Sequence, residues 1–223
     1  MHIGLIGGIG PAATDFYYRG LIERHARDGK TLELTMAHAD VREMGRNLAD
    51  RDAGRQAAIF ARLVARLKAA GAAVAAVTSM GGQFCVNELI AISPLPIVNG
   101  IPAVAEEVRR RGLKTVGILG TRLVMETGLY GAITSARVLA PEEGAARDRV
   151  HENYITMAGE GRVVDAQRQV FFAAGRALVK RGAEAVLLGG TDLFLAFQGQ
   201  DCGFPAIDCA DIHVEAIYRR AVP

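Results

Sequence analysis

The sequence predicts an α/β protein of two pseudo-symmetric lobes, each built on a parallel sheet, with a cleft between them. Short apolar runs that end in glycine or polar turns alternate with longer stretches of helical periodicity. This alternation is typical of βα units on a parallel sheet. Three segments also recur in the same order along the chain, and such internal repetition indicates two equivalent halves.

Several segments have the continuous apolar character of strands that are covered on both faces. We expect strands at 2–6, 32–37, 73–77, 96–98, 115–119, 185–188 and 205–207. Between them, residues 54–70 place Ile59, Leu63 and Leu67 on one stripe and the basic residues elsewhere. This spacing predicts an amphipathic surface helix, and residues 163–180 have the same pattern.

Each repeated segment of the first half has a counterpart in the second. The pairs are HIGLIGGIGPAATDFYY from His2 with TVGILGTRLVMETGLYG from Thr115, GAAVAAVTSM from Gly71 with GAEAVLLGGT from Gly182, and LPIVNGIPAVAEEV from Leu95 with FPAIDCADIHVEAI from Phe204. Their offsets are 113, 111 and 109 residues. We therefore expect a first lobe of residues 1–98 plus 210–223 and a second lobe of residues 99–209. Ligands of such folds bind where the strands end.

Composition narrows the class of partner. Half of the 223 residues are hydrophobic, which is enough for a sizeable core. The 26 basic and 24 acidic residues form no block of either sign, so we expect a small-molecule partner, no nucleic acid and no membrane. Three cysteines without metal-ligand spacing argue against a disulfide framework and against a metal site. Because no signal peptide or apolar run of membrane-spanning length is present, we expect a cytoplasmic location.

The glycine-rich stretch at residues 7–14 follows the first strand and opens a helix, so its backbone N–H groups are suited to an anion. We expect Gly8 to bind substrate and Thr14 to cap or pack within the loop. Read as Gly8-x-Gly10-x-x-Ala13, the stretch also resembles a dinucleotide fingerprint. That pattern requires an acidic residue about 20 positions further on, whereas Asp40 lies 27 positions after Ala13. We expect no cofactor, with an NAD-dependent enzyme as an alternative.

Two loops, TSMGGQFC and GGTDLFLAF, follow the expected strands at 73–77 and 185–188. If the halves face each other, the loops approach a substrate from opposite sides. Such symmetry suits removal of a proton from one face and its delivery to the other.

On these motifs the chain resembles the aspartate/glutamate racemase superfamily. IGLIGGIGPAAT is similar to its N-terminal signature, VGILGTRLVMETGLY to its middle signature, and GAEAVLLGGTDL with FPAIDCADIHVEA to its C-terminal pair. The resemblance covers essentially the whole chain. It implies a pseudo-symmetric two-domain fold, a role in amino acid metabolism, no cofactor and a homodimer.

The chain departs from this family at the residues that carry its chemistry. Racemases of the family use two cysteines, one in each half, and the corresponding positions here are Ser79 and Gly190. A serine hydroxyl is far too weak an acid to remove a Cα proton unaided, and glycine has no group to titrate. The family commonly has threonine where Val124 stands, so one carboxylate contact is also in doubt. We therefore expect no standard two-thiol racemisation.

Other side chains are candidates for catalysis and binding. We take as catalytic candidates Ser79, Gly190, Asp192 and Cys209. The substrate-binding candidates are Gly8, Arg42, Arg46, Met80, Gly81, Thr121 and Thr191. Arg42 and Arg46 are suited to clamping a carboxylate, with a solvated helix face as the alternative. Arg162 and Arg168 are weaker candidates for the same task.

The remaining polar residues have plainer interpretations. Cys85 is expected in the core, and Cys209 either faces the cleft or lies at a hinge. His213 is interpreted as a structural histidine. Residues 137–149 alternate basic and acidic side chains around a proline and are interpreted as an exposed connection without function.

Together these observations predict a racemase-family, isomerase-like enzyme that acts on a small carboxylate or amino acid by cofactor-independent carbon-acid chemistry. This prediction also includes a lyase-like reaction on the same kind of substrate. The alternative from another class is a carboxylate-binding protein of the same fold that has lost catalysis.

Overall fold

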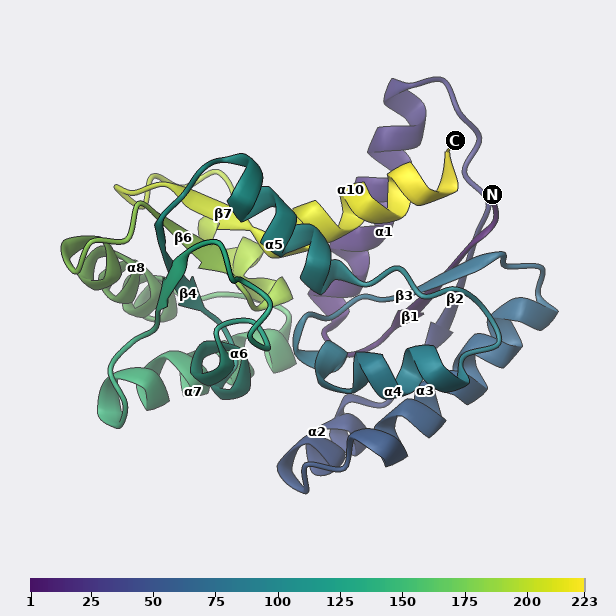
Figure 1. Ribbon diagram of the computed structural model, residues 1–223, viewed down its shortest axis with the longest axis horizontal. Coiled ribbons are helices and arrows are strands. Elements are labelled where there is room, and N and C mark those ends of the chain that lie inside the picture. Colours follow the sequence, from purple (N-terminus) through teal and green to yellow (C-terminus); the bar gives the residue numbers. More distant parts are fainter. Residues whose placement is uncertain (223) are drawn as a thin grey trace.

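The computed structural model describes residues 1–222, so residue 223 of the expected first lobe lies outside it. It contains two parallel sheets with helices around them (Figure 1). The first has the order β2-β1-β3, with β1 (Ile3–Gly7) between β2 (Leu34–His38) and β3 (Val74–Val77). Because β1 pairs in parallel with both neighbours, the carboxyl ends of all three strands lie at the same edge.

The second sheet has the order β5-β4-β6-β7 and is also parallel. Its strands are β4 (Thr115–Leu119), β5 (Arg137–Leu139), β6 (Ala185–Leu188) and β7 (Ala206–Asp208). Strand β5 corrects the expectation that residues 137–149 are an exposed connection. It is a three-residue edge strand with an exposed arginine at its start, so too little of it is apolar to stand out in the sequence.

The segment at 96–98, expected to be a strand, forms only an isolated bridge between Ile97 and Ala75 of β3. The prolines at 94 and 96 have no N–H to donate, which limits pairing at this edge. The bridge occupies the same place beside β3 that β7 occupies beside β6. The two sheets thus repeat one topology, and the predicted pseudo-symmetric α/β class is confirmed.

The helices follow the expected βα alternation. In the first half they are α1 (Pro11–Arg27), α2 (Val41–Ala49), α3 (Ala53–Ala69), α4 (Val86–Ile92) and α5 (Gly100–Arg110), with the 3₁₀ helix η1 (Gly81–Cys85). In the second they are α6 (Arg122–Thr127), α7 (Ala145–Glu160), α8 (Asp165–Lys180), α9 (Phe194–Phe197) and α10 (Cys209–Ala221), with η2 (Thr191–Leu193). The helices expected at 54–70 and 163–180 are α3 and α8.

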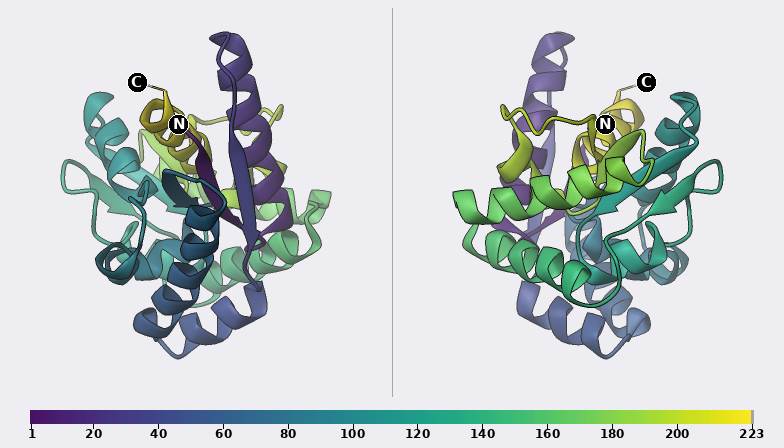
Figure 2. Two further views of the ribbon diagram at one scale, coloured as in Figure 1. Left: turned by 90° about the vertical axis from the view of Figure 1, so that its right-hand side faces the viewer. Right: turned by 90° about the vertical axis from the view of Figure 1, so that its left-hand side faces the viewer.

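Helices cover both faces of the sheets. Helix α3 packs on β1 and β2, while α7 and α8 lie side by side and α8 packs on β4 and β6 (Figure 2). Among residues 1–222, no helix is long and apolar enough to span a membrane.

The C-terminal helix α10 connects the two sheets. It starts directly after β7 and then packs against α1 and α5 (Figure 1). Val214 and Ile217 of this helix share a buried core with Ile3 and Leu5 of β1. The N-terminal ammonium group also donates to the Ala221 carbonyl oxygen at 2.9 Å. The chain therefore returns to the first sheet, and the exact lobe boundaries stay a prediction.

Candidate functional site

A pocket of about 540 Å³ lies where strands of both sheets end. The first half lines it with His38 at the end of β2, with the loops after β1, β2 (Asp40) and β3, and with α2, and the second half lines it with the loop after β4 and with α7. The predicted site residues that line it are Gly8, Arg42, Ser79, Gly81 and Thr121. Loops at the carboxyl ends of parallel strands are the usual place of ligand sites in α/β folds.

The loop after β1 is shaped by glycine and held by Thr14. Gly8 has a φ of 90°, a conformation that favours glycine. The Thr14 hydroxyl accepts from the Gly8 N–H at 2.9 Å and donates to the Gly10 carbonyl oxygen at 3.0 Å. Thr14 therefore packs within the loop, as expected.

Asp192 of η2 reaches across from the second half to this loop. Its Oδ1 accepts from the Ala13 N–H at 3.1 Å, and its Oδ2 would lie 2.7 Å from a Cβ placed on Gly10. Gly10 is the N-cap of α1 and has no side chain to offer, so Asp192 supplies the cap from elsewhere in the chain. The Asp192 side chain is almost fully buried, and this burial raises its pKa to about 6.

Tyr154 of α7 is the second partner of Asp192 and lines the pocket. Its hydroxyl donates to the Asp192 Oδ2 at 3.2 Å. Burial raises the pKa of Tyr154 well above its usual value, so the phenol stays neutral and acts as a donor. Sequence reasoning missed this residue, and only its position as a buried aromatic on a largely polar helix hinted at it.

Gly190 is covered by the Tyr154 ring. A Cβ at Gly190 would lie 2.3 Å from the nearest ring carbon, a distance that real Cβ atoms do not show. Tyr154 thus fills the space that a side chain at Gly190 would enter. Gly190 itself contributes no side chain to the pocket, and Thr191 is buried beside it without lining the pocket.

Ser79 and Thr121 line the pocket from opposite halves, and each already accepts one backbone hydrogen bond. The Ser79 Oγ accepts from the Gly82 N–H at 3.0 Å, and the Thr121 Oγ1 accepts from the Val124 N–H at 3.3 Å. Within residues 1–222 neither hydroxyl donates to a protein group. Both protons are therefore free to be donated to a bound carboxylate.

The two arginine candidates are not equivalent. Arg42 lines the rim of the pocket, is exposed, and pairs with Asp40 at 2.8 Å. Arg46 of the same helix is exposed and does not line the pocket. Arg162 and Arg168 lie outside the pocket and pair with neighbouring acidic residues.

Two further candidates lie in the core and not at the pocket. Met80 and Cys209 are fully buried in the cluster beneath the second sheet. Burial raises the pKa of the Cys209 thiol well above its usual value, so it stays protonated. The expectation that Cys209 faces the cleft is therefore corrected. Cys85 is also buried, as expected, with its pKa raised to about 12.

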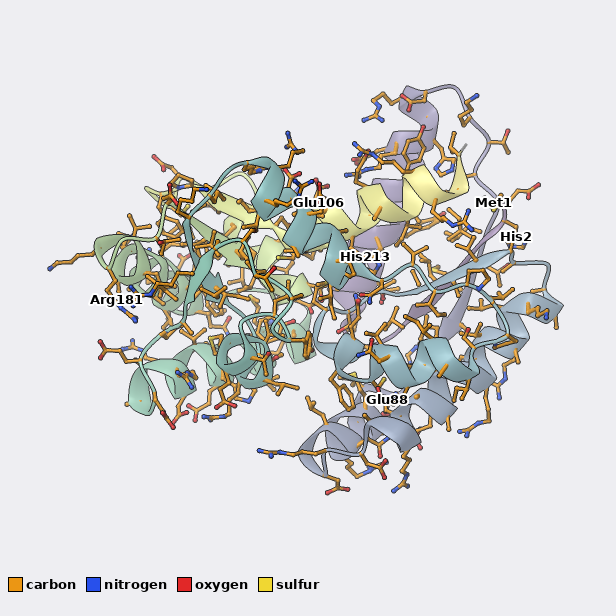
Figure 3. All side chains as sticks on the ribbon, viewed as in Figure 1. Met1, His2, Glu88, Glu106, Arg181 and His213 are labelled. Atoms are coloured by element: carbon orange, nitrogen blue, oxygen red, sulfur yellow. The ribbon has the colours of Figure 1, made fainter. Side chains whose placement is uncertain are left out.

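His213 lies on α10 between the two sheets (Figure 3). Its Nε2 is 2.9 Å from the Val98 carbonyl oxygen, which can only accept, so Nε2 carries the proton. Its Nδ1 then accepts from the Tyr17 hydroxyl at 2.9 Å. Burial lowers the pKa of His213 to about 4. The residue is neutral and fully bonded, which agrees with its interpretation as a structural histidine.

A second, more open hollow of about 680 Å³ lies beside β5. The second half alone lines it, and two of its three arginines already bond the protein backbone. Arg147 and Arg181 donate to the carbonyl oxygens of Pro141 and Ala140. Across residues 1–222, no group of three or more histidine, cysteine, aspartate or glutamate residues is arranged to hold a metal ion.

Fold and site together define an α/β protein in which two equivalent parallel sheets share one pocket at their strand ends. A family model described as Asp/Glu/hydantoin racemase matches residues 6–217, and the chain belongs to this family. The resemblance inferred from the motifs is thus confirmed.

Solved structures show the same fold. A candidate Asp/Glu racemase from Yersinia pestis superposes with a TM-score of 0.85 at 26% identity over 100% of both chains. An aspartate racemase homologue from Pyrococcus horikoshii has a TM-score of 0.80 at 24% identity, over 100% of this chain and 99% of the other. A glutamate racemase from Francisella tularensis, solved in complex with D-glutamate, has a TM-score of 0.70 at 14% identity, over 98% and 80%.

Proposed function

We propose that the protein is an isomerase-like enzyme that moves a proton at carbon in a small carboxylate or amino acid, without a cofactor and without two thiols. One observation carries this proposal. The shared pocket is lined by Tyr154, which bonds the buried Asp192 behind it, and on the other side by Ser79, and its described lining contains no cysteine. Family membership supports the racemase-like class.

The pocket has groups suited to hold a carboxylate. The free hydroxyl protons of Ser79 and Thr121 can each be donated to a carboxylate oxygen, and the Arg42 guanidinium at the rim, which is paired with Asp40, offers further N–H donors. The Francisella tularensis glutamate racemase, which has the same fold, was solved with D-glutamate. An acidic amino acid is therefore the first probe to try. A cytoplasmic location and a homodimeric state stay predictions.

Asp192, which lies behind Tyr154 and does not line the pocket, is the group that finally takes the proton. Because burial raises its pKa to about 6, a large fraction of Asp192 is ionised at neutral pH while it remains basic enough to accept a proton. An ordinary carboxylate is a weaker base by about two pKa units. This tuning is what a cofactor-independent proton transfer requires.

The test is proton NMR of the protein with single amino acids and dicarboxylic acids in deuterated water. We expect the Cα–H signal of at least one compound to disappear over hours. If no signal is lost from any compound, the enzyme proposal is wrong.

A carboxylate-binding protein without catalysis is the second candidate function. It is favoured by the role of Asp192 as a satisfied helix cap, which needs no chemistry to explain it. It predicts that a carboxylate raises the melting temperature by mass action while its Cα–H signal persists. Differential scanning fluorimetry on the same compounds separates the two.

A further inference from the structure

The Tyr154 ring occupies the space that a side chain at Gly190 would need. The ring of Tyr154 lies where a side chain at Gly190 would project, 2.3 Å from an added Cβ. The backbone of Gly190 has a φ of −101°, which any residue adopts, so the ring and not the backbone excludes a side chain here. Among the described second-half residues that line the pocket, Tyr154 of α7 is the one titratable side chain.

Asp192 has no direct access to the pocket. It is 1% exposed and does not line the pocket, whereas Tyr154 lines the pocket and donates its hydroxyl to the Asp192 Oδ2. The other oxygen of Asp192 is held by the Ala13 N–H. A proton from a bound molecule therefore reaches this carboxylate through the phenol.

The first half lines the opposite side of the pocket with Ser79 and with the exposed residues His38, Asp40 and Arg42, but with no buried, hydrogen-bonded pair like Tyr154–Asp192. Ser79 lies there, and its only bonded neighbour within residues 1–222 is the Gly82 N–H, a donor that cannot take the serine proton. A serine without a base does not remove a proton from carbon. The two sides of the pocket are thus chemically unequal.

We propose that Tyr154 is a catalytic residue that transfers the proton on one face of the substrate, with Asp192 as its proton reservoir. This inference rests on the proposed function. The Cα–H bond breaks, its proton moves to the Tyr154 Oη, and the Tyr154 proton moves to the Asp192 Oδ2. The electron pair stays on the substrate and is delocalised into its carboxyl group. In the reverse step, once the Tyr154 hydroxyl proton has exchanged with water in the pocket, Tyr154 gives a proton to the same face and regains one from Asp192.

One-face transfer has a stereochemical consequence. In deuterated water, transfer by Tyr154 replaces the Cα hydrogen by deuterium and keeps the configuration, so formation of the other enantiomer needs a second proton donor on the opposite face. Two-base racemisation gives the other enantiomer as deuterium enters. The two outcomes are separated by chiral chromatography of the exchanged amino acid.

The pH dependence follows from the state of Asp192. Deprotonation of substrate needs ionised Asp192, so the exchange rate rises with pH through about 6. The titratable groups that face Asp192 are Tyr154 from α7 and Tyr17 from α1, and both stay neutral in this range.

The experiment measures deuterium incorporation and enantiomer ratio for L-aspartate and L-glutamate. We expect the Tyr154→Phe variant to lose about 100-fold to 10,000-fold in exchange rate. The matched control is Tyr218→Phe, because the Tyr218 hydroxyl also donates to a carboxylate, that of Asp28, far from the pocket lining. This control should exchange at the wild-type rate.

Asp192→Asn is the second variant, since it keeps the size of the side chain. We expect a comparable loss, with residual exchange that no longer rises through pH 6. If the role of Asp192 is purely structural, the exchange rate of the Asp192→Asn variant still rises with pH through 6. Melting temperatures verify that each variant is folded.

The outcomes separate the two proposals. If wild-type protein exchanges neither probe nor any other compound of the NMR panel, the proposed function fails and the relay fails with it. If the wild type exchanges but Tyr154→Phe keeps its rate, only the relay is wrong. Formation of the opposite enantiomer at the rate of deuterium entry also overturns one-face transfer alone.

Discussion

The loops after β3 and β6 start from equivalent places in the two halves and fill the pocket wall in different ways. After β3, the chain itself supplies the wall, because the Ser79 side chain lines the pocket and accepts from Gly82 three residues on. After β6, Gly190 leaves an empty place, and Tyr154 from α7 enters it and bonds Asp192.

A repeated backbone in the two halves therefore does not imply the same side chains at the pocket. Both loops leave their strand and enter a 3₁₀ helix. Ser79 bonds a residue three positions further along the chain, whereas Gly190 allows the Tyr154 ring of α7 to come close. The absence of a side chain at Gly190 thus goes together with the Tyr154–Asp192 pair. The largest expected effects all concern this second loop.

The largest effect concerns the pH dependence of stability through Asp192. Its pKa is raised in the folded state, so its stabilising contribution is complete below about pH 4 and is lost as pH rises through about 6. The shift corresponds to roughly 3 kcal/mol of unfolding free energy. We expect the Asp192→Asn variant to lack this dependence.

Urea unfolding of both proteins from pH 3.5 to 7 measures it. Subtracting the two curves cancels the contributions of His213 and Asp208, whose pKa values are also shifted, to about 4 and about 7. Parallel curves across this range contradict the prediction.

A methyl group at Gly190 is the next test. Gly190→Ala places a Cβ against the Tyr154 ring, and overpacking of this kind costs about 1–3 kcal/mol. Gly45 of α2 is the control, since an added Cβ there meets nothing within 4 Å and the substitution favours the helix. We expect the urea midpoint to fall for the first variant and to stay or rise for the second. Equal midpoints for both variants are incompatible with the ring filling this space.

Ser79→Ala has a smaller effect. It removes one hydrogen bond from the Gly82 N–H, which is worth about 1 kcal/mol. Because no carboxylate is involved, we expect the same loss at pH 4 and at pH 7, in contrast to Asp192→Asn. A loss that depends on pH would mean that the two loops are electrostatically coupled.

The smallest effect on stability is expected for Arg42→Ala. Arg42 is exposed at the pocket rim and pairs only with Asp40, and such surface pairs contribute little. We expect an unchanged urea midpoint but a smaller rise of the melting temperature on adding L-glutamate. Arg46→Ala is the control, since Arg46 does not line the pocket. If both variants bind equally well, Arg42 has no part in carboxylate binding.

Much of the fold was predictable because it depends on local patterns. Apolar strands such as 115–119 and 185–188, and the amphipathic stripe of α3, follow from periodicity alone. The repeated segments predicted two equivalent sheets. The short strand β5 was not predicted, and the strand predicted at 96–98 forms only a bridge. Whether such short edge segments pair depends on the strand beside them.

The site was only partly predictable. Gly8, Ser79, Gly81 and Thr121 line the pocket as their places after strands indicated. Cys209 and Met80 did not, because they lie beyond the strand ends, at the starts of α10 and η1, where the sequence does not say which side faces the core.

The two-sheet architecture and the family follow from the sequence alone, whereas the absence of a cysteine at the two family positions stays a prediction. These depend on residue identity and on spacing along the chain. Only the tertiary structure decided that Tyr154 covers Gly190 and that Asp192 is buried with a raised pKa. Both result from contacts between segments distant in sequence, and burial, which shifts the pKa, exists only once those segments are packed together.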